Sequence, residues 1–278
     1  MPIITLTTDF GLKDPYVGAV KGAIYKELSD VVIIDISHYI SPFHIAETAY
    51  VIQNAYHSFP DGTIHIIGVD AELTPHNRHV VVYLNNHYFI CADNGVLSLI
   101  VNKLRPEKMV EINIHDRLGS NFTTLEVFVK TACHIARGGT LELIGKPISE
   151  LKEIAPILAK KAESEETIYG QVIYIDNYGN AVTNITRELI KAVGKGRSFE
   201  IAARSTKFKA IYERYSDIVY ANPNKEQRNA DGLAVAIYNS SDYLELATYK
   251  SNPLTVGSAA TLFGLHVDAP VIITFSKL

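Results

Sequence analysis

The feature that most constrains the fold is an alternation of strand-like and helix-like segments over the first seventy residues. Apolar runs typical of buried strands are IITLTTDF (3–10), VVIIDIS (31–37) and TIHIIGVD (63–70). The two segments between them place apolar residues at helical spacing. A strand–helix–strand–helix–strand order predicts a mainly parallel α/β sheet with helices on its faces.

The first helix-like segment, DPYVGAVKGAIYKEL (14–28), carries its own start signal. Asp14 is a favourable N-cap, and Pro15 suits the first helical position. The second segment, PFHIAETAYVIQNAYHSF (42–59), ends at the breaker PDG. Further strands are expected at HVVVYL (79–84) and YFICA (88–92), around the turn NNH, and further helices at 94–104 and 124–137.

The character of the sequence changes after the charged stretch AKKAESEET (159–167), which we interpret as a linker. Short β-branched segments follow, separated by turn residues: YGQVIYID, AVTNIT, SFEIAA, FKAIY, LAVAIY, YLELAT and APVIITF. This pattern is typical of a small antiparallel barrel or sandwich. We therefore predict an α/β domain over residues 1–160 and a smaller all-β, barrel-like domain over residues 168–278.

Charge and composition exclude some partners. The net charge is −4, the pI is about 6.2, and no run is rich in Lys or Arg. We therefore expect neither nucleic acid nor a membrane surface as a partner. No apolar run is long enough to cross a bilayer, and the first ten residues lack the pattern of a signal peptide. Cys91 and Cys133 are far apart, which favours buried thiols in a reducing cytoplasm.

Aspartates stand at or near the ends of all three early strands, as Asp9, Asp35 and Asp70. In open α/β sheets, ligands bind beyond the carboxyl ends of the strands, so these positions suggest a site. The alternative is that strand-end aspartates accept backbone hydrogen bonds in turns. Asp70 opens the polar loop DAELTPHNRH, which contains several titratable groups. Position alone leaves both interpretations open.

Several familiar motifs are excluded by their context. TTDFG contains the Asp-Phe-Gly of protein kinases but lacks the catalytic loop and the Gly-rich loop before it. GLKDPYVGAVKG does not match GxGxxG, and no GxSxG occurs. His76 and His79 are close in sequence, with His115 and His134 elsewhere, but there is no HExxH and no cysteine cluster. We expect neither a metal nor another cofactor.

One family shares an ordered set of segments with this chain. TTDFGLKDPYVGAVKG, IDISHYISPFHIAETAY, FPDGTIHIIGVD and ADNGVLSL lie in the N-terminal half. IDNYGNAVTNI, RYSD, IYNSSDYLELA and SAATLFGLHVDAPV follow in the C-terminal half. This set resembles the S-adenosylmethionine hydroxide adenosyltransferases and the related fluorinases and chlorinases. The resemblance spans nearly the whole chain. It implies an N-terminal α/β nucleoside-binding domain, a C-terminal β domain, and a homotrimer with sites at subunit interfaces.

The resemblance also implies roles for residues of the N-terminal domain. Asp9 and Asp14 fall where the family handles the nucleoside, with Asp14 on the ribose hydroxyls. Phe43 occupies an aromatic position that lines the pocket. Phe122, Thr123 and Thr124 are expected at the substrate, and Thr123 aligns with the family's histidine.

In the C-terminal domain, the resemblance places Asp176 on the methionine ammonium, Asn180 on adenine and Tyr215 against its ring. Ser240 and Ser241 fall in the segment that binds the methionine carboxylate and the adenine edge. The halogenases carry an arginine where Ser241 stands. These residue types suit the ligand, because an aromatic face suits a flat base, and carboxylates attract ammonium and hold diols. By composition alone, DNYGN is equally a hairpin loop.

The family's hydrolases activate water with an Asp-Arg-His set, and this chain retains part of it. Asp70 matches the aspartate, Asn77 aligns with the arginine, and Arg78 is the next residue. Arg78 is expected to compensate if the loop shifts by one position, since loops tolerate such shifts. Thr123 cannot replace histidine as a base, because the pKa of a hydroxyl is far too high. Asp70, Asn77 and Arg78 are thus the candidate catalytic residues.

Three functions fit this set. Hydrolysis of S-adenosylmethionine at C5′, to adenosine and methionine and at a slow rate, is the first. The second is binding of S-adenosylmethionine or adenosine without turnover. The third is a chlorinase-like adenosyltransferase, which the negative charge of Asp70 disfavours because it repels a halide.

Overall fold

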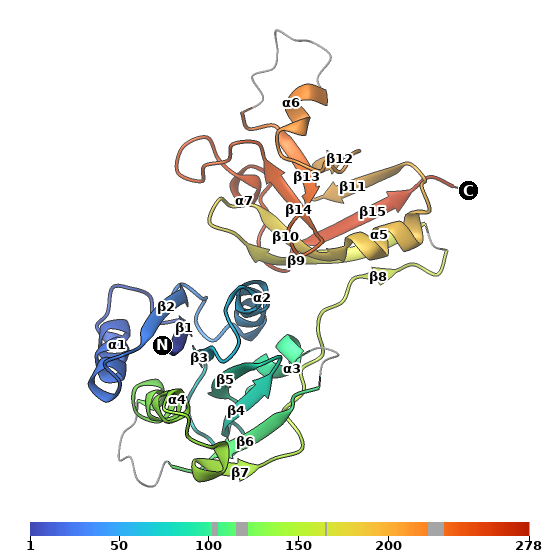
Figure 1. Cartoon of the computed structure of the whole chain (residues 1–278). Helices are drawn as coiled ribbons and strands as arrows, with labels where there is room; N and C mark the ends of the chain where they lie inside the picture. Colours follow the sequence, from blue (N-terminus) through green and yellow to red (C-terminus); the bar gives the residue numbers. More distant parts are fainter. Residues whose placement is uncertain (102–104, 115–121, 165, 222–230, 278) are drawn as a thin grey trace. The chain divides into compact units, whose positions relative to one another are not determined.

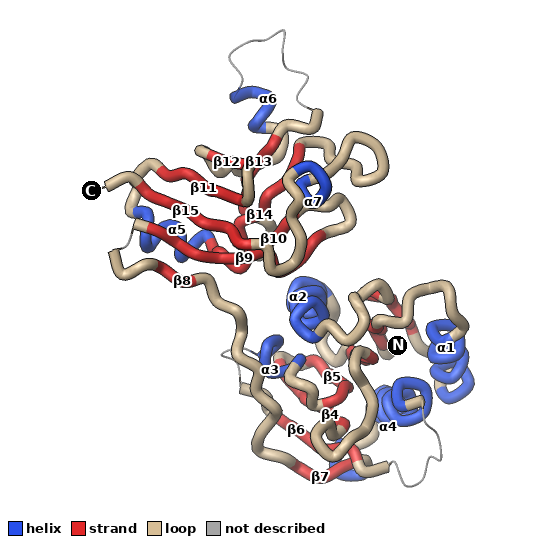
Figure 2. The backbone as a smooth tube through the Cα atoms, turned by 180° about the vertical axis from the view of Figure 1, so that it is seen from behind, coloured by secondary structure: helices blue, strands red, loops and turns tan. Residues whose placement is uncertain are grey.

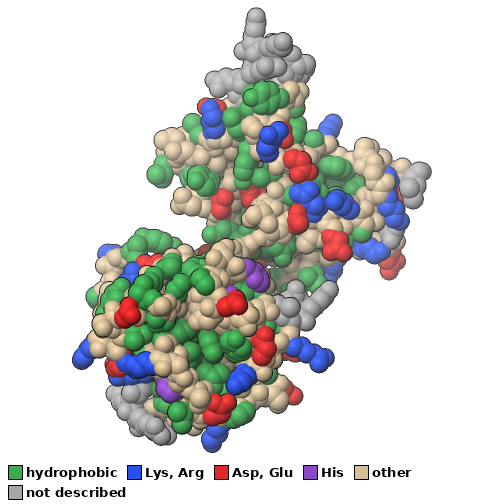
Figure 3. Space-filling view, viewed as in Figure 1, with side chains coloured by type: hydrophobic (Ala, Val, Ile, Leu, Met, Phe, Trp, Pro, Cys, Tyr) green, Lys and Arg blue, Asp and Glu red, His purple; other side chains and the backbone are tan. Residues whose placement is uncertain are grey.

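The computed structural model describes residues 1–278 except 102–104, 115–121, 165, 222–230 and 278 (Figure 1). The chain divides into two compact units, Met1–Pro156 and Ile157–Leu278. The prediction of an α/β unit followed by an all-β, barrel-like unit is confirmed. Within the described ranges, no helix is long and apolar enough to cross a membrane. Basic and acidic side chains are interspersed over the face seen in Figure 3.

The first unit is built on a mixed sheet with the strand order β2-β1-β3-β5-β4-β6-β7. The strands are β1 (Ile3–Thr8), β2 (Val32–Ser37), β3 (Ile64–Gly68), β4 (His79–Leu84), β5 (His87–Ala92), β6 (Lys108–Ile112) and β7 (Gly145–Pro147). The pairs β1–β2, β1–β3 and β3–β5 are parallel, whereas β4 pairs antiparallel with both β5 and β6. Strands β6 and β7 were not expected from the sequence. The edge strand β2 is only half-buried, although its apolar run predicted a buried strand.

Helices cover both faces of this sheet (Figures 1 and 2). The helices are α1 (Tyr16–Glu27), α2 (Ile45–Ala55), α3 (Val96–Val101) and α4 (Val129–Ala136). Side chains of α1 and α4 enter one apolar cluster with Ile4 and Leu6 of β1. Side chains of α2 and α3 enter a second cluster with Phe89 of β5. Cys91 and Cys133 are free, buried thiols, as predicted.

The second unit is an antiparallel sheet with the strand order β12-β11-β15-β9-β10-β14-β13. The strands are β8 (Lys160–Lys161), β9 (Thr167–Ile175), β10 (Ala181–Thr186), β11 (Phe199–Ala203), β12 (Thr206–Phe208), β13 (Ala234–Tyr238), β14 (Tyr243–Thr248) and β15 (Pro270–Phe275). A bridge between Tyr212 and Ile237 brings the two ends of the sheet together, so it is nearly closed. Strand β8 pairs with β9, so Lys160 and Lys161 belong to this sheet.

The second unit differs from the expectation at two places. The segment FKAIY was expected as a strand, but β12 ends at Phe208 and the chain then bends. The helix α5 (Arg187–Gly194) was not expected, although its start signal is present, because Thr186 accepts a hydrogen bond from the Leu189 amide at 3.1 Å. The unit also contains the short helices α6 (Asp217–Ala221) and α7 (Ala259–Leu262).

Candidate functional site

The carboxyl ends of β1 and β3 form a topological switch point. From β1 the chain passes through α1 to β2 on one side, and from β2 through α2 to β3 on the other side. Crevices in open α/β sheets form at such points. A Cβ on Gly68 would lie 2.8 Å from Thr124 Oγ1 and 3.2 Å from Thr8 Cγ2. Glycine is therefore required at the end of β3, where Thr8 and Thr124 approach it.

Asp70 stands just beyond β3 in a left-handed backbone conformation, with a φ of +46°. Such conformations are uncommon outside glycine, and Asp and Asn tolerate them better than other residues. Strained backbone persists only where the surroundings hold it, and it clusters at functional sites. The left-handed conformation of Asp70 ends the strand and is consistent with a functional role for this residue.

Side chains from elsewhere in the unit hold the backbone around Asp70. The Asn94 amide donates to the carbonyls of Val69 and Asp70, at 3.1 and 3.2 Å. The Asn77 amide donates to the carbonyls of Asp70 and Glu72, both at 3.1 Å. The buried His79 ring lies 3.0 Å from the Ala71 carbonyl. Four successive carbonyls, from Val69 to Glu72, are thus clamped.

The Asp70 carboxylate itself makes no hydrogen bond or ion pair with the described part of the chain. Asn77 is buried and its amide nitrogen serves the loop backbone, so its observed contacts are those of a clamp. Arg78 binds elsewhere: its Nε donates to Asp93 at 2.9 Å and its Nη2 to the Glu150 carbonyl at 2.5 Å. The structure thus places Asn77 against the Asp70 backbone and Arg78 in a separate network.

The loops after β1 and β2 meet beside this point. Asp9 Oδ2 accepts a hydrogen bond from the Phe43 amide at 3.0 Å. Phe43 has a φ of +62° and a side chain that is 71% exposed. The expectation that Asp14 caps α1 is wrong: Pro15 is the N-cap residue, and no side chain caps the helix. The exposed Asp14 carboxylate makes no hydrogen bond or ion pair with the described residues and is available to a ligand.

Three aromatic rings lie next to these loops. Phe10, Tyr16 and Phe122 pack edge to face or tilted, with ring centroids 5.5 to 5.9 Å apart. Phe122 and the half-buried Thr123 lead into a π-helical turn at Thr124–Phe128. Such turns inside helices are frequently found at functional sites. The predicted segment Phe122–Thr124 therefore lies at the same sheet edge as Gly68.

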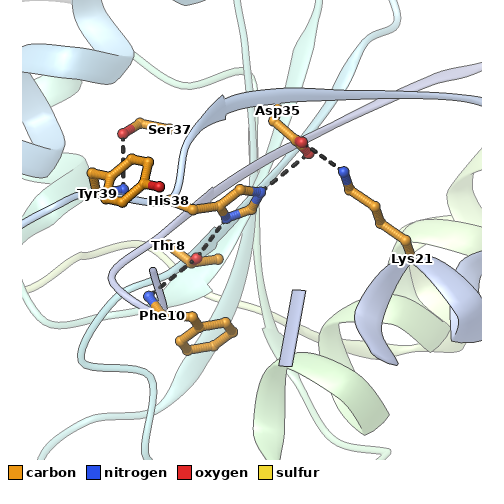
Figure 4. A network of polar contacts seen from close by, with 7 residues as sticks. All are labelled: Thr8, Phe10, Lys21, Asp35, Ser37, His38 and Tyr39. Atoms are coloured by element: carbon orange, nitrogen blue, oxygen red, sulfur yellow. Dashed lines mark hydrogen bonds and ion pairs between the residues drawn. The ribbon is translucent and has the colours of Figure 1, made fainter. Parts of the chain in front are cut away.

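Sequence reasoning missed a polar network behind this edge (Figure 4). Thr8 Oγ1 lies 2.7 Å from His38 Nδ1, and His38 Nε2 lies 3.1 Å from Asp35 Oδ1. Lys21 of α1 donates to the other oxygen of Asp35 at 2.5 Å. Burial raises the pKa of Asp35, but the hydrogen bonds and charges of Lys21 and His38 prevail and lower it. In the sequence, the signal for this network was the short segment DISH (35–38), which contains both Asp35 and His38.

In the second unit, Asp176 opens the turn between β9 and β10. Its Oδ1 accepts hydrogen bonds from the amides of Tyr178 and Asn180, both at 2.8 Å, and its Oδ2 accepts one from the Asn180 side chain at 2.9 Å. Asn180 is buried and also contacts the Ser251 hydroxyl. The hairpin-loop interpretation of DNYGN is therefore correct. An ionised carboxylate has about four acceptor positions, so one is left for a ligand.

Glu245 of β14 is a further residue that the sequence did not indicate. It is buried, and Tyr215 donates its phenolic hydrogen to the Glu245 carboxylate. Desolvation raises the pKa of Glu245, and the nearby charge of Asp176 raises it further. Glu245 pairs with Val182 of β10, two residues beyond Asn180 in the Asp176 turn. Tyr215 remains 38% exposed, so its ring is accessible while its hydroxyl is tied down.

Ser240 and Ser241 lie in the turn between β13 and β14, where Asn239 Oδ1 accepts the Ser241 amide at 3.0 Å. This turn leads into β14 at Tyr243, which pairs with Thr186 at the end of β10. The Asp176 turn leads into β10 at Ala181, which pairs with Leu246 near the end of β14. The two turns are therefore at opposite ends of the β10–β14 pair. Ser241 instead lines a hollow with Arg187, Lys191 and Asp242.

The histidines noted in the sequence lie apart. His79 holds the Ala71 carbonyl, His134 contacts the Thr140 carbonyl at 2.9 Å, and His76 is exposed. His115 lies outside the described residues. In the part of the chain that the structure describes, no group of three or more His, Cys, Asp or Glu is arranged to hold a metal ion.

Comparison with known proteins defines the class. Residues 4–145 match the SAM hydroxide adenosyltransferase N-terminal domain, and residues 170–272 match the C-terminal domain. The chain belongs to the SAM hydroxide adenosyltransferase family, and the expected membership is confirmed.

Individual relatives carry two kinds of name. An (R)-S-adenosyl-L-methionine hydrolase of Methanocaldococcus jannaschii is 28% identical over 91% of this chain and 90% of its own length. A protein of the same name from Thermus thermophilus is 24% identical over 95% of this chain and 96% of its own length. A fluorinase of Nocardia brasiliensis is 24% identical over 88% of this chain and 90% of its own length. The crystal structure of an uncharacterized conserved protein from Thermotoga maritima shares the fold, with a TM-score of 0.81, 24% identity and coverage of 98% and 99%.

Proposed function

We propose that this chain binds S-adenosylmethionine and hydrolyses it at C5′ to adenosine and methionine. The observation that carries the proposal is the Asp70 carboxylate. It stands at the topological switch point, its backbone is clamped in a left-handed conformation, and no described residue occupies its oxygens. A fixed carboxylate with free acceptor positions is suited to orient one water molecule for attack.

In the proposed step, the water oxygen forms a bond to C5′ while the C5′–S bond breaks. The electron pair of that bond moves to sulfur, which leaves as the neutral thioether of methionine, and the attacking water releases one proton to the Asp70 carboxylate, which passes it to solvent. A charged, oriented acceptor favours this step because positive charge develops on the attacking oxygen. Asp70 is the catalytic residue, whereas Asn77 serves by holding the Asp70 carbonyl.

Binding of the nucleoside is assigned to the residues around the loops after β1 and β2. The Asp14 carboxylate is free to accept both hydrogen bonds of a ribose diol. The exposed Phe43 ring is an apolar surface beside Asp9. In the second unit, the remaining acceptor position of Asp176 suits the methionine ammonium, and the exposed Tyr215 ring suits the base.

Halide transfer is the less favoured alternative. No cation neutralises the Asp70 carboxylate within the described residues, so a halide at the attacking position would be repelled. Binding without turnover is the second alternative. It is consistent with Arg78, which is held by Asp93 and the Glu150 carbonyl.

The test is incubation of the purified protein with S-adenosylmethionine in water enriched in oxygen-18, followed by chromatography and mass spectrometry. Both sulfonium epimers are used, because the hydrolases named above carry the (R) epimer in their names. Adenosine labelled at the 5′ oxygen is the expected product. Retained binding with no adenosine from either epimer would establish the non-hydrolytic binder. A 5′-chloro nucleoside formed in chloride buffer would establish the halide reaction.

The assembly proposed with this function is a homotrimer, in which each site combines the first unit of one subunit with the second unit of the next. Its support is the division of the binding residues into two sets, one in each unit. A heterologous contact with three-fold symmetry closes a ring and completes three identical sites. Light scattering at assay concentration is expected to give three times the mass of the 30.7 kDa chain. A monomer that still turns over substrate would contradict this assembly.

A further inference from the structure

Two loops that carry proposed binding residues leave neighbouring strands and are joined at three places. One loop follows β1 and carries Asp9 and Asp14, and the other follows β2 and carries Phe43. The Gly11 amide donates to the His38 carbonyl at 2.7 Å, and the Phe43 amide donates to Asp9 at 3.0 Å. The third join is the contact of Thr8 with the His38 ring, at 2.7 Å.

His38 takes part in two of these joins, through its carbonyl and its ring. It is 4% exposed; its Nδ1 lies 2.7 Å from Thr8 Oγ1, and its Nε2 lies 3.1 Å from Asp35 Oδ1 without the geometry of a hydrogen bond. Because the Asp35 carboxylate only accepts hydrogen bonds, Nε2 facing it carries a hydrogen, while Nδ1 contacts the Thr8 hydroxyl. Thr8 Oγ1 in turn accepts the Phe10 amide at 3.4 Å, which fixes the start of the first loop (Figure 4).

We propose that His38 is a positioning residue of the nucleoside site, held by Asp35 and Lys21 and acting through the Thr8 hydroxyl on the loop that carries Asp9 and Asp14. This inference rests on the proposed function. It adds that the geometry of the binding loops is set by a side chain just after β2, one that does not touch the ligand. Asp35 is the anchor, because it faces the ring on one side and Lys21 on the other.

The chain contains a matched control for this network on the same strand. Thr5 Oγ1 also lies 2.7 Å from a histidine Nδ1, that of His65, and both residues are buried. The Nε2 of His65 meets His87 at 3.2 Å rather than a carboxylate. Thr5 lies in the middle of β1 and Thr8 at its carboxyl end. Thr5→Val and Thr8→Val therefore each remove a threonine–histidine hydrogen bond of the same length, but only Thr8 is next to a loop.

The first measurement is amide hydrogen exchange of the free protein by NMR. Thr8→Val is expected to speed the exchange of the Gly11 and Phe43 amides by about tenfold or more, the effect of losing one buried hydrogen bond. Thr8→Ser, which keeps the hydroxyl, is expected to restore the wild-type rates. Thr5→Val is expected to leave these two amides unchanged while costing a similar amount of global stability. Equal exchange in all four proteins would overturn the proposal.

The second measurement is adenosine binding by calorimetry. Thr8→Val and His38→Ala are expected to raise Kd by about tenfold, and Thr8→Ser and Thr5→Val to leave it near the wild-type value. Loosened loops with an unchanged Kd would show that the network does not position the ligand. A wild-type protein that binds neither adenosine nor S-adenosylmethionine refutes the proposed function, whereas the exchange rates, measured for His38→Ala as well, still decide whether His38 fixes the loops.

Discussion

Asp70 and Asp176 both follow a strand and open a loop, yet their carboxylates are used in opposite ways. The backbone at Asp70 is held by Asn77 and Asn94, and its carboxylate has no partner among the described residues. The Asp176 carboxylate accepts three hydrogen bonds from its own turn. Asp70 is a residue that its surroundings hold in place, and Asp176 is a residue that holds its surroundings.

The difference separates chemistry from architecture. A carboxylate that must orient water needs free acceptor positions and a fixed backbone. Hydrogen bonds from other side chains to the backbone carbonyls fix the backbone and leave the carboxylate oxygens free. A carboxylate that builds a turn keeps only one position for a ligand, which is enough for a single ammonium contact. Substitutions at the two aspartates therefore should affect different properties, and the following experiments test that separation.

The largest expected effect is on turnover. Asp70→Asn should lower the rate of adenosine formation by at least about 100-fold, or about 2.7 kcal/mol, because the amide lacks the charge that favours the attacking water. Asparagine tolerates the left-handed conformation, so the melting temperature and adenosine affinity should stay near their wild-type values. Turnover is measured by chromatography under saturating substrate. A variant with a wild-type rate would remove Asp70 from the mechanism.

The next effect is on stability, and it belongs to the other aspartate. Asp176→Ala should lower the free energy of unfolding of the second unit by about 2–3 kcal/mol, since three hydrogen bonds are lost and the amides of Tyr178 and Asn180 lose their acceptor. Urea denaturation followed by tyrosine fluorescence provides the measurement. Asn177→Ala, at an exposed position in the same turn, is the control and should change stability by less than about 0.5 kcal/mol. Equal losses in both variants would contradict the assigned role.

Much of the fold could be predicted from the sequence because its signals are local. The strand ending in Thr8, the helix after it and the strand ending in Ser37 all carry an apolar pattern or a start signal within their own residues. Strand β6 (KMVEI) mixes charged and apolar residues, and its place is set by pairing with β4. The family resemblance located the candidate site residues along the chain.

The connections of the site could not be predicted, because they join distant residues. Asn94 reaches back across 24 residues to the Asp70 carbonyl, and nothing in its neighbourhood indicates that contact. Arg78 was expected to replace the family's arginine if the loop shifted by one residue. Adjacent side chains point in different directions, however, and the Arg78 guanidinium contacts Asp93. Asp14 was expected as a helix cap, but α1 starts at Tyr16 and no side chain makes a capping hydrogen bond there.

A smaller effect tests whether the Asp70 backbone is strained. Asp70→Ala should be less stable than Asp70→Gly by about 1 kcal/mol, because alanine has a Cβ in the left-handed conformation and no side-chain hydrogen bonding to offset it. Both variants lack the carboxylate, so a difference in stability between them reports the backbone alone. Thermal unfolding of the two proteins gives the comparison. If alanine and glycine are equivalent, the clamped loop has relaxed to an ordinary conformation and the φ of +46° is not essential to it.

The smallest effect is confined to one titration, that of Glu245. Burial and the charge of Asp176 raise the pKa of this carboxyl, so the folded state keeps its proton at a pH where the unfolded state has lost it. The stability of the second unit therefore falls as the pH rises from the ordinary value of 4.5 through the raised pKa. Asp176→Asn keeps an acceptor for the turn but removes the repelling charge, so it should lower the pKa of Glu245 and weaken that loss of stability. Carbon-13 NMR of the Glu245 carboxyl follows the titration directly. Asp268→Asn, which changes a carboxylate bound to Gln171 in the same unit, should leave the pKa in place. If both variants shift it equally, the effect is one of net charge, and Asp176 acts on its unit only through the hydrogen bonds of its turn.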